Sequence, residues 1–163
     1  PRWEDSRSCS GFNYRMMELQ GAVGLAQLKK LDYVVEKQRE NADLIEQAIA
    51  DLSIEMRTVP DGSFETADAL VFFVDNNRTA RKCRDALLKA TLGTKILPEA
   101  ITWHFAGTWD HMQELVNRNG IDLINAFPVS LKLLNRSVSL PIAINMVDNF
   151  PTKIRETLMS VLK

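Results

Sequence analysis

The sequence is poor in cysteine, lacks an excess of charge of either sign and has no long apolar run. Two cysteines, Cys9 and Cys83, in 163 residues give no basis for a disulfide framework or a thiolate metal site. A net charge of −1 argues against a nucleic acid partner, because binding phosphates needs a surplus of cations. No apolar run approaches the roughly 20 residues that span a bilayer, and residues 1–5 lack the features of a signal peptide. We therefore expect a cytoplasmic globular chain with no membrane, nucleic acid or metal partner.

The rest of the composition is that of an ordinary folded chain, since 45% of the residues are apolar. A chain of this length can form one domain that buries roughly 70% of the surface of its unfolded form. It begins with Pro1 rather than Met. We therefore expect a fragment or a processed product of a longer protein.

The first regular segment is expected to be one long helix over residues 17–50, which contain no proline. Such a helix would be about 50 Å long and would overhang a compact domain of this size. Residues 16–28 are apolar on nearly all sides, and Gly21 and Gly24 would let another backbone pack closely. We expect a connector covered by something outside the chain. Its apolar face is predicted to comprise Leu25, Leu28, Leu31, Val35, Ala42, Ile45 and Ile49.

The alternative is a break near Lys29–Lys30, which would give two helices of one bundle. The periodic pattern by itself leaves both possibilities open.

The rest of the chain predicts an α+β fold, in which a few-stranded sheet is covered by helices. Alternation predicts a strand at 53–59, and the apolar run at 69–74 predicts a central strand. Residues 75–77 offer an N-cap for a helix that ends at Gly93. Further helices are expected at 109–119, 129–135 and 150–163, and a further strand at 137–140.

Several kinds of site find no support in the residues. Gly21 and Gly24 lie within a helical pattern, so they do not form a phosphate-binding loop. His104 and His111 match no known metal-ligand spacing. As a nucleophile, Cys9 would need a histidine from about a hundred residues away.

Two clusters could carry chemistry. Residues 11–16 place an Asn, a Tyr and an Arg on the approach to a helix start, where free backbone N–H groups suit an anion. Residues 103–109 hold three large aromatic rings around an imidazole, a composition that can stack on a sugar or another ring. The structural alternatives are a capped helix and an aromatic plug over a loop.

The first cluster belongs to a longer run of motifs, in which Asn-x-Arg-Met at 13–16, Glu-Leu-Gln at 18–20 and Gly-Leu-x-Gln-Leu at 24–28 follow in order without gaps. These motifs resemble the signature that opens the C-terminal part of the DegT/DnrJ/EryC1/StrS family. Its members are sugar aminotransferases that use pyridoxal phosphate on the type I aminotransferase fold. Residues 137–142 and the closing helix resemble the end of that family, and residues 94–112 are most similar to enzymes that make 8-amino-3,8-dideoxy-octulosonate.

The resemblance implies roles for individual residues. Asn13 matches the asparagine that reaches across the dimer to the cofactor phosphate of the neighbouring subunit. Arg15 is expected to shape the same anionic pocket, and Tyr14 to line it. His104 falls roughly where the family has a histidine near the sugar, with Trp103 as a stacking partner. The motif around His104 departs from the family's usual form.

The resemblance also implies that this chain is incomplete as an enzyme. The lysine that binds the cofactor covalently lies in the family's large N-terminal domain, before the Asn-x-Arg-Met motif, so these residues alone are expected to be inactive. The implied organisation is a loop at 1–16, an interdomain helix at 17–50 and the small C-terminal domain at 51–163.

The intact protein would be a cytoplasmic homodimer with a shared active site. It would transfer an amino group, with glutamate as donor, to a keto or aldehyde sugar such as 8-oxo-3,8-dideoxy-octulosonate in lipopolysaccharide biosynthesis. Two alternatives from other classes are a non-catalytic scaffold for a full-length relative and a carbohydrate-binding α+β module.

Overall fold

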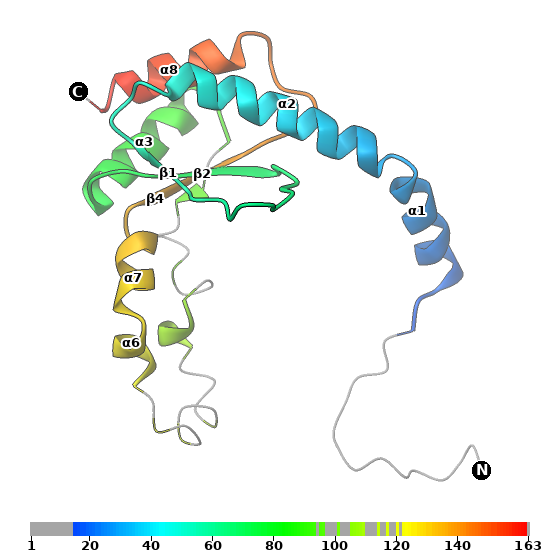
Figure 1. Cartoon of the computed structure of the whole chain (residues 1–163), viewed down its shortest axis with the longest axis horizontal. Coiled ribbons are helices and arrows are strands. Elements are labelled where there is room, and N and C mark those ends of the chain that lie inside the picture. The colour runs from blue at the N-terminus through cyan, green and yellow to red at the C-terminus, as the bar shows by residue number, and fades with distance from the viewer. Residues whose placement is uncertain are drawn as a thin grey trace. The chain divides into compact units, whose positions relative to one another are not determined.

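The structure is a computed structural model that describes residues 15–93, 95–96, 101, 105–109, 114, 117, 120 and 122–162 (Figure 1). The chain divides into two compact units, Pro1–Tyr33 and Val34–Lys163. The first unit contains helix α1 (Glu18–Leu28) and the start of α2 (Leu31–Ile49). The second unit holds the sheet and the hydrophobic core.

The sheet has the strand order β1-β2-β4-β3, and each neighbouring pair is antiparallel. β2 (Ala69–Phe73) and β4 (Ser137–Pro141) form its centre, with Leu70 opposite Leu140 and Phe72 opposite Val138. The flanking strands β1 (Glu55–Met56) and β3 (Lys95–Ile96) are only two residues long. The predicted strands at 69–74 and 137–140 are therefore confirmed as the central pair.

Three helices cover one face of the sheet: the second-unit part of α2, α3 (Asn77–Lys89) and α8 (Phe150–Met159), which lie on one side of the strands in Figure 1. Alternate residues of the central strands point into this layer, because side chains along a strand alternate between its two faces. The fold is thus the expected α+β layer. Its core contains Ala42, Ile45, Ile49, Leu70, Phe72, Val74, Ala80, Cys83, Leu87, Leu92, Val138, Leu140, Ile142, Phe150, Ile154 and Leu158.

Helix α3 shows how local residues set the bounds of an element. Asn76 caps its start, since its side-chain oxygen accepts a hydrogen bond from the Thr79 backbone N–H at 2.9 Å. The helix ends at Lys89 rather than at the predicted Gly93, because Thr91 takes the left-handed conformation with a φ of 59°. The backbone N–H of Leu92 then bonds to the Leu87 carbonyl at 2.9 Å, which turns the chain toward β3.

The prediction of one long helix over residues 17–50 is wrong in one respect. The segment forms two helices, α1 and α2, which are separated at Lys29–Lys30. The Lys30 N–H bonds to the carbonyl of Gln27, three residues back, at 2.9 Å. The regular α-helical hydrogen bonds to the carbonyl four residues back therefore end at this point. The break is where the alternative interpretation placed it. Only the C-terminal half of the predicted apolar face is buried, through Ala42, Ile45 and Ile49.

Helix α1 buries none of its residues. A Cβ atom added to Gly24 would meet nothing within 4 Å, so no backbone in the described chain packs against it. The exposed apolar side chains of this region are Met16, Met17, Leu19, Val23, Leu25, Leu28, Leu31 and Tyr33.

Other boundaries differ by a few residues. The strand predicted at 53–59 is reduced to Glu55–Met56, because Ile54 bonds back to Leu52 in a turn and Pro60 has no N–H to donate. Short helices α6 (Leu123–Ala126) and α7 (Pro128–Leu134) precede β4. Most of the helix predicted at 109–119 lies outside the described residues. Among the residues that the structure describes, no helix combines the length and the apolar character needed to cross a bilayer.

Candidate functional site

The residues singled out from the sequence fall mainly outside the described part of the chain. This holds for Asn13, Tyr14, Trp103 and His104. Arg15 is described: it is exposed and lies three residues before α1. Neither predicted cluster is therefore tested by geometry, and both stay predictions.

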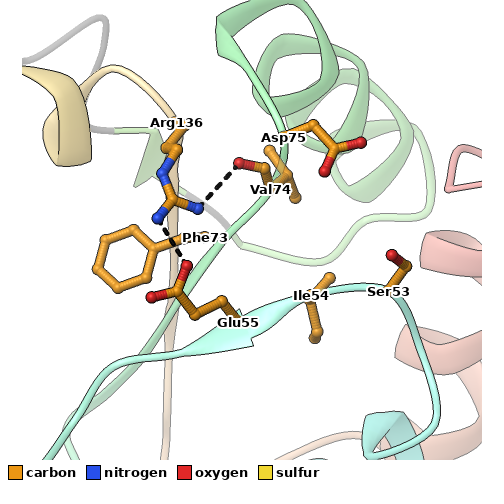
Figure 2. Close-up of a pocket in the computed structure, with 7 residues that line it drawn as sticks. All are labelled: Ser53, Ile54, Glu55, Phe73, Val74, Asp75 and Arg136. Atoms are coloured by element: carbon orange, nitrogen blue, oxygen red, sulfur yellow. Dashed lines mark hydrogen bonds and ion pairs between the residues drawn. The ribbon is translucent and has the colours of Figure 1, made fainter.

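A polar cavity of about 240 Å³ lies where β2 ends and β4 begins (Figure 2). Its walls come from segments far apart in the sequence: the β1 region, the end of β2 and the residue before β4. Seven residues line it: Ser53, Ile54, Glu55, Phe73, Val74, Asp75 and Arg136.

Arg136 is the central group of this pocket. Its Nη2 donates to Oε2 of Glu55 at 2.6 Å, and its Nη1 donates to the Val74 carbonyl at 3.3 Å. The guanidinium carbon lies 5.1 Å from the centre of the Phe73 ring, within the range of a cation–π contact. Arg136 is thus held on three sides, as Figure 2 shows, and its side chain is only 21% exposed.

No signal in the sequence pointed to Arg136. It stands in a turn between a helix and a strand, and its acidic partner is 81 residues away. Only the antiparallel pairing of β2 with both β1 and β4 brings Glu55, Phe73 and Arg136 together.

A second cavity, of about 260 Å³, opens between the end of α3, the end of β4 and the start of α8. No charged residue lines it, so it does not suit a phosphate group. It is lined by Ile45, Thr91, Leu92, Gly93, Leu140, Pro141, Ala143, Asn145, Met146, Val147 and Ile154.

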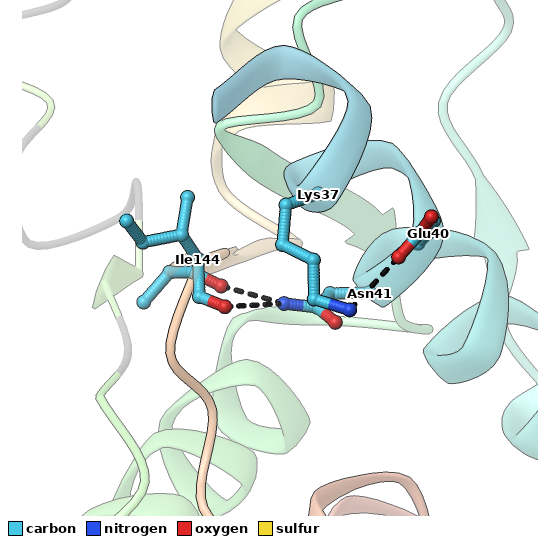
Figure 3. A network of polar contacts seen from close by, with 5 residues as sticks. Lys37, Glu40, Asn41 and Ile144 are labelled. Atoms are coloured by element: carbon cyan, nitrogen blue, oxygen red, sulfur yellow. Dashed lines mark hydrogen bonds and ion pairs between the residues drawn. The ribbon is translucent and has the colours of Figure 1, made fainter. Parts of the chain in front are cut away.

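A buried polar contact joins α2 to the segment after β4 (Figure 3). The Asn41 side chain is 4% exposed and donates from Nδ2 to the carbonyls of Ala143 and Ile144, at 2.8 and 3.4 Å. One turn earlier, Gln38 donates to the carbonyl of Ile142 at 3.0 Å. The two amides donate to backbone carbonyls that lie beyond the end of β4 and have no partner in the sheet. Their role is therefore to hold the chain between β4 and α8 in place.

The pKa values of Cys83 and Glu46 are shifted, but neither group forms a site. Burial raises the pKa of the Cys83 thiol to about 11, so the side chain is a protonated part of the core and not a nucleophile at neutral pH. Desolvation, aided by the negative charges of Asp43 and Glu65, raises the pKa of Glu46. Among the described residues, no group of three His, Cys, Asp or Glu side chains could hold a metal ion.

The family model of the DegT/DnrJ/EryC1/StrS aminotransferases matches residues 2–159. The chain belongs to this family. Among curated proteins, the GDP-perosamine synthase of Vibrio cholerae is 24% identical over 132 residues, which cover 80% of this chain and 33% of that protein. The chain thus spans about a third of the length of this relative.

Solved structures show the same fold. A sugar aminotransferase from Streptococcus pneumoniae, in its apo form, superposes with a TM-score of 0.75 at 16% identity, and the match covers 98% of this chain and 38% of that one. The same S. pneumoniae protein is also known in PMP and PLP forms. An Escherichia coli GDP-4-keto-6-deoxy-D-mannose-3-dehydratase with bound hydrated PLP gives a TM-score of 0.63 at 16% identity, covering 92% of this chain and 37% of that one. The fold of this family member is therefore part of an aminotransferase fold.

We expect Glu55 and Arg136 to contribute unequally to stability. Glu55→Gln should lower the free energy of unfolding by about 1 kcal/mol or less, because an exposed ion pair is weak. Arg136→Ala should cost more, about 1–3 kcal/mol, since it also removes the Val74 hydrogen bond and the packing on Phe73. Urea denaturation of the two variants measures both values.

Arg57→Ala is the matched control, since Arg57 pairs with Glu65 and its side chain is 45% exposed. Its loss in the free energy of unfolding should be similar to that of Glu55→Gln. Equal losses for Arg136→Ala and Arg57→Ala would show that Arg136 is not held more firmly than an ordinary surface arginine.

Asn41→Ala should lower the free energy of unfolding by about 1–3 kcal/mol, because it removes a buried amide and its hydrogen bonds to the carbonyls of Ala143 and Ile144. In a urea titration the midpoint should fall while the slope stays constant. Gln47→Ala, at an exposed position of the same helix, is the control and should change the midpoint little. An unchanged midpoint for Asn41→Ala would contradict the structural role of this amide.

Proposed function

We propose that this chain is the C-terminal part of a pyridoxal-phosphate-dependent sugar aminotransferase. The observation that carries the proposal is the family match over residues 2–159. In addition, this chain covers only about two fifths of the length of the solved relatives. In this proposal the rest of the protein is the large domain, which supplies the lysine that binds the cofactor.

The described residues are compatible with a small contribution to the cofactor site. Arg15 is exposed and lies just before α1, near a helix start, where an anion is favoured. We propose that Asn13, Arg15 and Tyr14 hold the cofactor phosphate of the neighbouring subunit. Bound pyridoxal phosphate would supply the electron sink for amino transfer, while this segment would position its phosphate.

The substrate side of the proposal is a keto or aldehyde sugar, with His104 and Trp103 on the wall of its pocket and glutamate as amino donor. The V. cholerae relative is a GDP-perosamine synthase, which favours a nucleotide-linked sugar in the same class of reaction. An 8-oxo-octulosonate and a place in lipopolysaccharide biosynthesis remain our proposal for the specific substrate and pathway.

A second candidate function is sugar dehydration, which the E. coli dehydratase of the same fold suggests. The two can be separated by product analysis with the longer polypeptide. An amino sugar formed together with a keto acid supports transamination, whereas loss of water from the sugar supports dehydration.

The domain organisation and the dimer also follow from the proposal. Residues 1–16 would leave the large domain, residues 17–50 would cross to the small domain and residues 51–163 would form it. The apolar side chains of α1, which the described chain leaves exposed, would be covered at a cytoplasmic homodimer interface and by the large domain.

In the polypeptide that includes the large domain, Asn13→Ala should weaken pyridoxal phosphate binding about tenfold, because one charge-assisted hydrogen bond to the phosphate is lost. Cofactor titration followed by absorbance measures the change. Asn135→Ala, on the turn after α7, is the control and should leave the affinity unchanged. Unchanged affinity for Asn13→Ala would refute this phosphate contact.

The chain should self-associate through α1, and Leu19→Gln combined with Leu25→Gln should reduce this association. Both side chains are more than half exposed, at 71% and 60%, so the variants remove apolar surface without opening the core. Sedimentation velocity over a range of concentrations provides the measurement. Val129→Gln, which alters an apolar residue of α7 that is 72% exposed, should have no effect. A wild-type chain that is monomeric throughout would contradict the proposal.

A further inference from the structure

We propose that the cavity at the end of β4 binds a small aliphatic carboxylic acid, with its chain among the apolar side chains and its carboxylate on the ammonium of Lys153. The cavity has a volume of about 260 Å³ and is lined by Leu140 and Pro141, so it lies at the opposite end of β4 from Arg136. The proposal does not rest on the proposed aminotransferase function, and either can fail without the other.

The floor of this cavity is apolar and belongs to the core of the second unit. Ile45, Leu92, Leu140 and Ile154 line it, and all four side chains are buried. They come from α2, the turn after α3, β4 and α8, so several packed elements fix the shape of the floor. An apolar chain can therefore enter a site that exists before the ligand arrives.

A polar group stands at the rim, which is formed by exposed residues such as Thr91. The Thr91 hydroxyl donates to the Ala90 carbonyl at 2.6 Å and accepts a hydrogen bond from Nζ of Lys153 at 3.2 Å. Thr91 has a φ of 59°, which a β-branched residue seldom adopts, so the turn after α3 sets the place of this hydroxyl. The hydroxyl in turn holds the Lys153 ammonium beside the mouth of the cavity.

Lys153 has a positive charge and no anion to neutralise it. In the part of the chain that the structure describes, no carboxylate forms an ion pair with its half-buried side chain. A ligand carboxylate would therefore gain a charge-assisted hydrogen bond without displacing a protein group. Because no charged residue lines the cavity, the rest of the ligand must be uncharged and apolar.

The volume of the cavity sets the length of the ligand. About 260 Å³ lies below the usual range of sites for drug-sized molecules. It holds roughly eight or nine groups of the size of a water molecule, each of which takes about 30 Å³ in the liquid. Hexanoate, with six carbons and two oxygens, is of this size.

The test uses the full chain and three probes with the same chain of carbon atoms: hexanoate, hexanamide, which is neutral, and hexylamine, which is a cation. Isothermal titration calorimetry gives the affinities, and methyl chemical shifts of Ile45, Leu92 and Ile154 locate the site. We expect hexanoate to bind with a millimolar dissociation constant and the other two probes at least fivefold more weakly. Butanoate should bind about tenfold more weakly than hexanoate, because it buries two fewer methylene groups.

Lys153→Gln should weaken hexanoate binding at least fivefold and leave the affinity for hexanamide unchanged. A variant that merely damaged the fold would weaken both probes. Lys153→Arg should keep most of the affinity for hexanoate, since it keeps the charge. Lys132→Gln is the matched control: Lys132 is exposed on α7, and the change in net charge is the same, so hexanoate affinity should not change.

A second variant blocks the cavity itself. Ala143 is exposed and lines the cavity, so Ala143→Phe should fill the space from the rim without altering the core, and hexanoate binding should be lost. Ala126→Phe, at the exposed end of α6, is its control and should bind hexanoate as the wild-type chain does. Circular dichroism confirms that each variant is folded.

The proposal is overturned if hexanoate does not bind the wild-type chain, or if hexanamide or hexylamine binds as tightly as hexanoate. It is also overturned if Lys153→Gln or Ala143→Phe leaves the affinity for hexanoate unchanged. Tighter binding of inorganic phosphate than of hexanoate would contradict it as well, in favour of a plain anion site at Lys153.

Discussion

The second unit depends on the burial of one face of a small sheet under three helices. β2 and β4 place alternate apolar side chains into this layer, and α2, α3 and α8 each add a short row of residues that meets them. Because burial of apolar surface is the main favourable term in folding, these elements are expected to form and melt together. The edge strands β1 and β3 add little, and they are positioned by the central pair.

The burial of one face of the sheet also explains which helices and strands could be predicted from the sequence. The run at 69–74 and the rows of α3 and α8 are local patterns, so their element types follow from neighbouring residues, as does the Asn76 cap. The end of α3 could not be predicted, because Thr91 takes a left-handed conformation that glycine normally favours. The sequence located the break at Lys29–Lys30 only as an alternative to one long helix, because both lysines are good helix formers and the periodic pattern continues past them.

The Arg136 pocket was beyond local reasoning for a different reason. Arg136, Glu55 and Phe73 carry no motif, and they meet only because β1 and β4 pair with opposite edges of β2. The motifs that carried the family resemblance, by contrast, are contiguous in sequence and needed no fold. The family was therefore indicated by residues 11–28, which form α1 or precede it, whereas the pocket became visible only with the sheet.

The contrast between α1 and the second unit favours a chain that works as part of something larger. In the second unit, the apolar side chains that recur at helical spacing form the buried face of each helix, as an amphipathic pattern predicts. In α1 the apolar residues surround the helix, and none is buried. A helix that is apolar on all sides is typical of the interior of a large protein, so it needs cover on more than one side. A single partner helix would leave part of α1 exposed, so the cover would have to come from more than one side, as in the proposed combination of a large domain and a second subunit. The exposure of α1 thus agrees with the proposal drawn from the family match.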